Sequence, residues 1–101
     1  MRIIKHLAEQ IADEVEGMCE YAKDALEWRY FDQELSKVYY ELAKTEYTHV
    51  EKLHAQVARK IEEAKSQQIQ PTEKMLAKWE EIHKELIEKT AEAKMYLDMY
   101  R

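Results

Sequence analysis

A glutamate and a histidine three residues apart occur twice in the chain within the same local context. Residues 42–49 read Leu-Ala-Lys-Thr-Glu-Tyr-Thr-His, and residues 76–83, thirty-four positions later, read Leu-Ala-Lys-Trp-Glu-Glu-Ile-His. Positions i and i+3 lie on one face of a helix, so each copy can direct a carboxylate and an imidazole at a common point. Helix bundles bind metal ions with such pairs. The repeat therefore predicts metal ligation by Glu46 and His49, and by Glu80 and His83.

The spacing alone is weakly specific, because the chain has 21 acidic residues and 4 histidines. Glu51 and His54 show the same spacing without the Leu-Ala-Lys context. We interpret these two residues, and His6, as solvated polar positions.

Composition predicts one all-α domain. A chain of 101 residues is long enough for one core and too short for two. A β-rich fold needs a turn residue every 8 to 12 positions, roughly, and only Gly17 and Pro71 are available here. Alanine, glutamate, lysine, leucine and glutamine, which favour helices, are abundant.

Charge and cysteine content narrow the function classes. The net charge is −5, with basic residues scattered among acidic ones, which argues against nucleic acid and anionic lipid as partners. The single cysteine, Cys19, excludes an intrachain disulfide and indicates a reducing compartment. Neither a membrane-spanning run nor a secretory signal is evident, so we expect a cytoplasmic protein.

Apolar spacing predicts helices over about residues 2–29, 32–66 and 71–100, with short connections that make the bundle antiparallel. Asp32 is a good N-cap for the second helix, and Pro71 and Thr72 open the third. The expected inward-facing residues of the first helix are Ile4, Leu7, Ile11, Glu14, Met18, Tyr21, Ala25 and Trp28; of the second, Leu35, Val38, Leu42, Glu46, His49, Leu53, Val57 and Ile61; and of the third, Leu76, Trp79, His83, Leu86, Thr90, Ala93, Leu97 and Tyr100.

Folding the first helix onto the second about a turn near residue 30 or 31 places residue 14 opposite residue 47. Glu14 is thereby expected between Glu46 and His49. The same reasoning about a turn near residue 68 or 69 places residues 88–91 opposite this group. Glu80 and His83 are then offset by roughly eight residues, or about 12 Å along a helix. One chain is therefore not expected to bring both motifs together.

The segment from Asp32 to His49 resembles the second helix of rubrerythrin and other ferritin-like proteins, in which an apolar run leads into a ligand Glu-x-x-His. Glu14 followed seven residues later by Tyr21 is similar to the first-helix motif of the rubrerythrins. The resemblance covers about residues 10–60. It implies metal binding by Glu14, Glu46 and His49, Tyr21 near the site, and iron or manganese as the metal, with ferroxidase or peroxide-linked oxidase chemistry.

The chain departs from the family pattern because only one helix follows residue 70, whereas a complete ferritin-like domain has four helices. If the last helix stands for the fourth, Glu80 and His83 are the second motif. Alternatively, two chains complete the site, as in half-ferritins such as the encapsulated ferritins. We therefore expect a homo-oligomer, a dimer or larger. The ten aromatic residues, more than one slim bundle buries, favour the same expectation.

Structural roles compete with ligation at each of these positions. Glu14 can set helix register or pair with a lysine, Glu46 and His49 can be a surface pair beside the core, and His83 can be a packed histidine. Tyr21 fits a core position better than a redox role. The alternative function is a non-catalytic helical-bundle interaction protein, phage- or assembly-associated, that binds no metal and uses an aromatic face. A regulatory coiled-coil subunit is a third interpretation.

Overall fold

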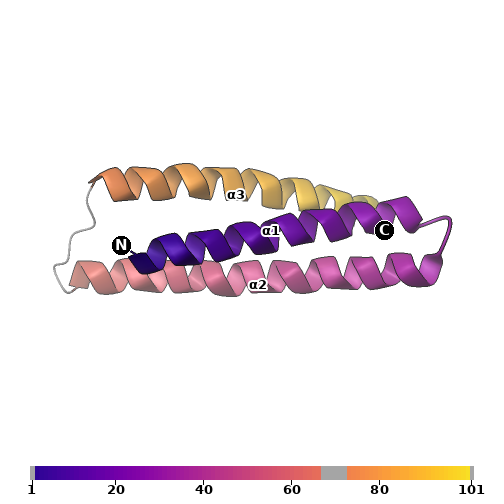
Figure 1. Cartoon of the computed structure of the whole chain (residues 1–101), viewed down its shortest axis with the longest axis horizontal. Helices are drawn as coiled ribbons and strands as arrows, with labels where there is room; N and C mark the ends of the chain where they lie inside the picture. Colours follow the sequence, from indigo (N-terminus) through magenta and orange to yellow (C-terminus); the bar gives the residue numbers. More distant parts are fainter. Residues whose placement is uncertain (1, 67–72, 101) are drawn as a thin grey trace.

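The chain folds into a rod of three long helices. A computed structural model describes residues 2–66 and 73–100, and the side chains of the last segment from residue 76 onward. Helix α1 spans Arg2–Trp28, α2 spans Gln33–Ser66 and α3 spans Glu73–Tyr100. The rod measures 56 × 18 × 18 Å. Figure 1 shows α1 and α3 running in one direction and α2 in the other. The predicted all-α, up-down-up bundle is confirmed, whereas the expected start at Pro71 and Thr72 lies outside the described residues.

Helix α1 is the centre of the bundle, because it packs along both other helices while α2 and α3 contact each other at few points. Its inward face is almost completely covered, and α2 presents a narrower row of small residues at seven-residue intervals. A seven-residue repeat of small side chains lets two helices approach closely and stay in contact along their length. The buried residues are Leu7, Ala8, Ile11, Val15, Met18, Ala22 and Ala25 of α1; Ser36, Ala43, Val50, Val57 and Ala64 of α2; and Leu86 and Ala93 of α3.

The predicted inward faces of α1 and α2 are rotated slightly from the observed ones. Val15 is fully buried where Glu14 was expected, and Glu14 lies at the edge of the core. On α2, Val38 and Leu42 are 46% and 38% exposed, and Trp28 of α1 is 40% exposed. The expectation that these three residues are core residues is wrong. The buried row of α2 consists of serine, alanine and valine residues, and larger apolar residues such as Leu42 lie beside it.

The predicted inward face of α3 is confirmed. Leu86 and Ala93 are buried, and Trp79 packs against the core cluster, to which all three helices contribute. Residues of α3 seven apart therefore rest on α1. In residues 2–66 and 73–100, none of the helices is long and apolar enough to span a bilayer.

The connection between α1 and α2 is tight and hydrogen-bonded. The backbone amides of Phe31 and Asp32 both donate to the Trp28 carbonyl, which closes the end of α1. The Asp32 carboxylate accepts a hydrogen bond from the Leu35 amide at 3.1 Å, so Asp32 is the N-cap of α2 as predicted. One turn later the buried Ser36 hydroxyl donates to the Ala25 carbonyl of α1. The turn and this bond together set how α2 aligns along α1.

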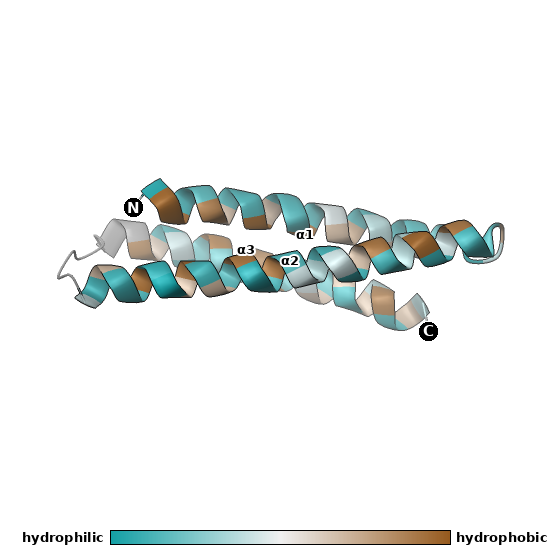
Figure 2. Ribbon diagram, turned by 90° about the horizontal axis from the view of Figure 1, so that it is seen from below, coloured by the Kyte–Doolittle hydropathy of each residue, from teal (hydrophilic) through white to brown (hydrophobic). Residues whose placement is uncertain are grey.

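Contacts between α2 and α3 are made by side-chain pairs rather than by a continuous core. Tyr40, Tyr47 and His54 of α2 are seven residues apart and reach α3 in succession. The Tyr40 ring stacks on Tyr100 with 4.3 Å between centroids, and the Lys94 ammonium lies 4.5 Å from the Tyr47 ring centroid. His54 meets His83. In Figure 2, turned by 90° from Figure 1, α2 crosses in front of α3. We refer to these three contacts as the α2–α3 ladder.

Ser36→Ala is expected to lower the free energy of unfolding by about 1 kcal/mol, because it removes a buried interhelical hydrogen bond at the point that aligns α1 with α2. Urea denaturation followed by circular dichroism measures the change. The matched control is Ser66→Ala, since Ser66 is exposed and its hydroxyl donates to the Glu63 carbonyl of its own helix. The control is expected to stay within about 0.5 kcal/mol of the parent. Equal effects of the two substitutions would contradict a special role for Ser36.

Candidate metal centre

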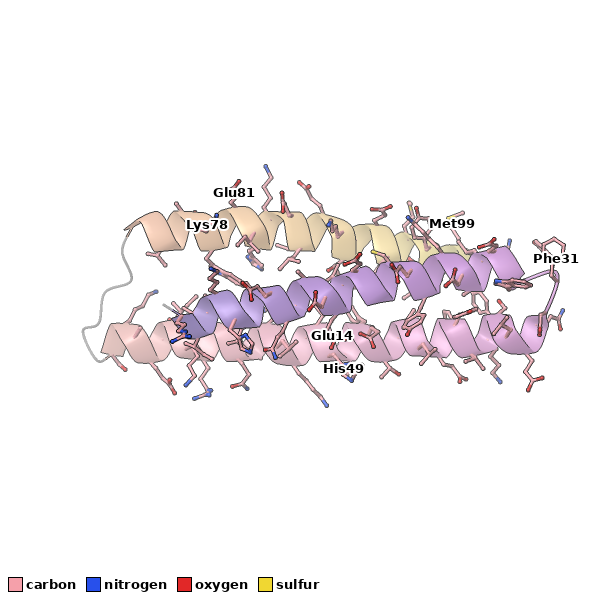
Figure 3. All side chains as sticks on the ribbon, viewed as in Figure 1. Glu14, Phe31, His49, Lys78, Glu81 and Met99 are labelled. Atoms are coloured by element: carbon pink, nitrogen blue, oxygen red, sulfur yellow. The ribbon has the colours of Figure 1, made fainter. Side chains whose placement is uncertain are left out.

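Glu14 of α1 meets Glu46 and His49 of α2 about halfway along the hairpin. The Nδ1 atom of His49 lies 3.3 Å from Oε2 of Glu14 and 3.9 Å from Oε1 of Glu46. One ligand atom from each residue falls within 4.8 Å of the other two. Figure 3 shows the Glu14 and His49 side chains extending from adjacent helices. The predicted meeting of these three side chains is confirmed, while their role as metal ligands remains a prediction.

The alignment of the hairpin explains this convergence. The group lies on both helices at nearly equal distance from the turn that ends α1 and begins α2. Glu46 and His49 are three residues apart and so share a face of α2. Glu14 precedes the fully buried Val15, which places Glu14 at the edge of the α1–α2 contact. The core therefore holds the backbones under the group and leaves the polar ends of the side chains near the surface.

The group is accessible to water. The side chains of His49, Glu14 and Glu46 are 45%, 30% and 22% exposed. Without a cation, the His49 imidazole lies within 4 Å of both carboxylates. With a cation, one imidazole nitrogen and two carboxylate oxygens make a mixed donor set of the kind that suits manganese, iron or zinc. Three protein donors leave positions open for water or for groups from a second chain.

Gly17 lies directly beside Glu46. A Cβ atom built on Gly17 would be 3.6 Å from Oε2 and 3.9 Å from Cδ of Glu46, which is ordinary van der Waals contact. An alanine would therefore fit without moving the carboxylate. The glycine leaves a small open space next to the group, at a cost to helix stability of about 1 kcal/mol relative to alanine.

Tyr21 lies two helical turns from Glu14 and is half-buried. Its ring stacks on Tyr39 of α2, with 6.1 Å between centroids and 25° between planes. This aromatic pair extends the α1–α2 contact toward the turn. Packing accounts for Tyr21, as the core interpretation predicts.

Within the part of the chain that the structure describes, Glu80 and His83 do not join the group of Glu14, Glu46 and His49. Glu80 is exposed, and Nε2 of His83 lies 2.9 Å from Nε2 of His54. The expected alignment of α3 holds at His54, because reflection about residue 68 or 69 places residue 54 opposite residue 83, and these two side chains meet. Tyr47 reaches Lys94, about one helical turn beyond the expected residues 88–91. The two Glu-x-x-His motifs stay separate along the rod, as the sequence predicts.

His54, expected from the sequence to be a solvated position, is exposed but contacts His83 of α3. The His54 and His83 rings have centroids 4.8 Å apart and planes inclined by 29°. Trp79 stacks on His83 at 5.2 Å with 9° between planes. Burial, and next the nearby His54, lower the pKa of His83 from its ordinary 6.5. The spacing of Tyr40, Tyr47 and His54 was the available signal, because it marks one face of α2.

An open groove of about 520 Å³ runs between α2 and α3 on the ladder side of the bundle. Its walls combine tyrosine, threonine and lysine side chains with one aspartate. The lining residues are Tyr40, Lys44, Thr45, Tyr47, Thr48, Lys94, Leu97 and Asp98. The Tyr47 hydroxyl is the main cause of the raised pKa of Lys94, which keeps the ammonium charged. None of the metal-centre residues lines this groove.

Comparison with protein-family models, with curated proteins and with solved structures finds no match to this chain.

Lowering the pH is expected to destabilise the protein through His83. The folded-state pKa of His83 is depressed, so below pH 6.5 the unfolded chain binds more protons at this residue than the folded chain does. The contribution of neutral His83 to the free energy of unfolding is therefore complete above pH 6.5. It is lost as the pH falls below 6.5. Melting temperatures measured from about pH 8 to about pH 5 test this, because that range spans the ordinary histidine pKa. As the pH is lowered, the melting temperature of His83→Gln is expected to fall less steeply than that of the parent. The control His6→Ala, which alters an exposed histidine, is expected to follow the parent. If the melting temperature of His83→Gln falls as steeply as that of the parent, His83 is not the source of the pH dependence.

Proposed function

We propose that the protein is a ferritin-like carboxylate protein that binds two iron or manganese ions per assembly, with Glu14, Glu46 and His49 as the ligands from each chain. The observation that carries the proposal is the convergence of these three side chains, within 4.8 Å, on a hairpin whose alignment is set by the core. Two carboxylates and one imidazole per helix pair are also the donor set of helix-bundle di-metal sites.

The proposal requires a second copy of the chain. Three donors from one chain are half of a di-metal set, and a two-fold axis would bring a second hairpin with an identical set. Val38 and Leu42 support such a contact: they share the outer face of α2 with His49 by helical spacing, and they are exposed. Trp28 extends the same face on α1 and is 40% exposed. Apolar residues around a polar group are what a dimer interface over this centre would need.

A pair of bound iron or manganese ions would supply one-electron redox chemistry, the basis of ferroxidase or peroxide-linked oxidase activity. The protein's own contribution is positioning. The α1–α2 core holds Glu14 opposite Glu46 and His49, and the exposure of His49 leaves a path for an ion to enter. Covering the centre by a second chain would then limit the access of water.

The second candidate function, a helical-bundle interaction protein without a metal, is favoured by the exposed residues at the turn. Tyr30 and Phe31 are 80% and 82% exposed, and Met99 of α3 is 55% exposed. Figure 3 shows Phe31 and Met99 at the same end of the rod. The metal content of the purified protein distinguishes the two candidate functions, because the interaction protein needs no metal.

Glu46→Ala and His49→Ala are each expected to abolish binding of Fe²⁺ or Mn²⁺ by protein purified without chelator. Calorimetric titration under anaerobic conditions measures the binding. The melting temperature of the parent should rise with added metal, since a ligand bound only by the folded state stabilises it by RT ln(1 + [L]/Kd), or about 2.7 kcal/mol at 100 Kd. The two variants should show no rise.

Glu51→Ala is the matched control, because Glu51 is an exposed glutamate of α2 close to His49 in sequence but outside the group. It is expected to bind metal like the parent. An absence of both metal uptake and a melting shift in the parent would sink the metalloprotein proposal and leave the interaction protein. Loss of binding in Glu51→Ala as well would show that surface charge, not the group, attracts the ion.

Static light scattering is expected to give a mass of at least twice the 12.2 kDa of one chain. Leu42→Lys should shift the protein toward the monomer, because it places a charge on the proposed interface. Ile87→Lys is the matched control: Ile87 is 56% exposed on α3, outside the α1–α2 face. The control should keep the parental mass. A monomeric parent would remove the two-fold completed centre.

A further inference from the structure

The contact between His54 and His83 is a meeting of two nitrogen donors on different helices. The two Nε2 atoms are 2.9 Å apart, and the residues lie twenty-nine positions apart in the chain. Their rings come from α2 and α3, the pair of helices with the fewest contacts in the bundle. Without an ion, one imidazole donates its N–H to the other nitrogen, and this bond uses the Nε2 atoms of both rings.

The surroundings hold one ring and leave the other free to adjust. Trp79 stacks on His83 with nearly parallel planes, so the tryptophan constrains the orientation of that ring. His54 is exposed and is reached from solvent.

We propose that His54 and His83 form a second metal site, in which their Nε2 atoms chelate Cu²⁺, Ni²⁺ or Zn²⁺ and join α2 to α3. The proposal is independent of the centre at Glu14, Glu46 and His49. At metal–nitrogen distances of about 2.0–2.1 Å, two ligands at a right angle lie about 2.9 Å apart, and two tetrahedral ligands about 3.3 Å apart. The observed separation fits the right angle of tetragonal Cu²⁺ or Ni²⁺, and a small movement of the exposed His54 ring fits Zn²⁺.

The donor set decides which metals bind. Among the described residues, no carboxylate or cysteine joins the two imidazoles within ligand distance. Imidazole nitrogens suit copper, nickel and zinc, whereas manganese and magnesium prefer carboxylate oxygens. Water completes the coordination. The two centres of the protein therefore differ in preference: carboxylate-rich at Glu14, Glu46 and His49, and nitrogen-only at His54 and His83.

An ion at this site would strengthen the helix pair that the core holds least. The other contacts of the α2–α3 ladder are a tyrosine stack and a lysine–tyrosine contact. A cation that binds only when both helices are in place stabilises the folded state by linkage. The N-terminal half of α3 should then exchange its amide hydrogens more slowly in the presence of the ion.

The stacking of Trp79 on His83 provides a local reporter. In a Trp28→Phe background Trp79 is the single tryptophan, and Trp28 lies at the other end of the rod. Cu²⁺ bound beside the stacked ring is expected to quench Trp79 fluorescence saturably. His54→Asn and His83→Asn in this background keep a hydrogen-bonding side chain but lose the imidazole ligand, and each should remove the saturable quenching. In a His49→Ala background, which removes a ligand of the other centre, Zn²⁺ should raise the melting temperature, and adding His54→Asn or His83→Asn should remove that rise.

Two controls separate this site from others. His49→Ala in the same background should retain the full quenching, although it loses the ligand proposed for iron or manganese. His6→Ala, which alters an exposed histidine of α1, should also retain it. Quenching that persists in both asparagine variants, or that disappears in His49→Ala, would overturn the proposal. Since His54 is exposed, His54→Asn keeps the test valid even if His83→Asn fails to fold.

Discussion

The structure depends on the close packing of α1 against both other helices. Seven residues of α1 are buried, and α2 presents small buried residues at intervals of seven. The small side chains of Ala25, Ser36 and Ala43 leave no exposed surface at this contact. The buried row of α2 runs from Ser36 to Ala64, so the contact extends along about 40 Å of the helix at 1.5 Å per residue. The alignment of the hairpin follows from this contact, and the positions of the polar groups follow from the alignment.

The candidate metal centre shows how the core positions chemistry without enclosing it. Val15 is fully buried, while the preceding Glu14 keeps 30% of its side chain exposed. A difference of one residue on a helix is a rotation of about 100°, enough to move a carboxylate from the core to its edge. Glu46 and His49 occupy the corresponding edge of α2. The three side chains therefore meet beside the buried core, where solvent or a second chain can still reach them.

The contact of α2 with α3 is of a different kind, because it is made by paired side chains. Tyrosine, lysine and histidine side chains reach across the gap, and an open groove lies beside them. Such pairs contribute less apolar burial than a packed seam, so this side of the bundle is more dependent on specific contacts. The His54–His83 pair is one of these contacts, and its nitrogen donors give it a chemical character that the oxygen-rich group on the other side of the hairpin lacks.

The sequence alone predicted the local structure and one part of the site. Helical spacing and the scarcity of turn residues determined three helices, and Asp32 marked the start of α2. The short turn near residue 30 determined that Glu14 lies opposite Glu46 and His49, because counting residues away from a tight turn gives the level of each side chain. The tertiary structure decided how the helices rotate about their axes. Burial of Val15 and exposure of Val38 and Leu42 follow from the close approach of small residues, which hydrophobicity does not indicate. It also decided that the His54 and His83 side chains touch: counting away from residue 68 or 69 gives their common level, but the contact depends on how α3 rotates as it packs against α1.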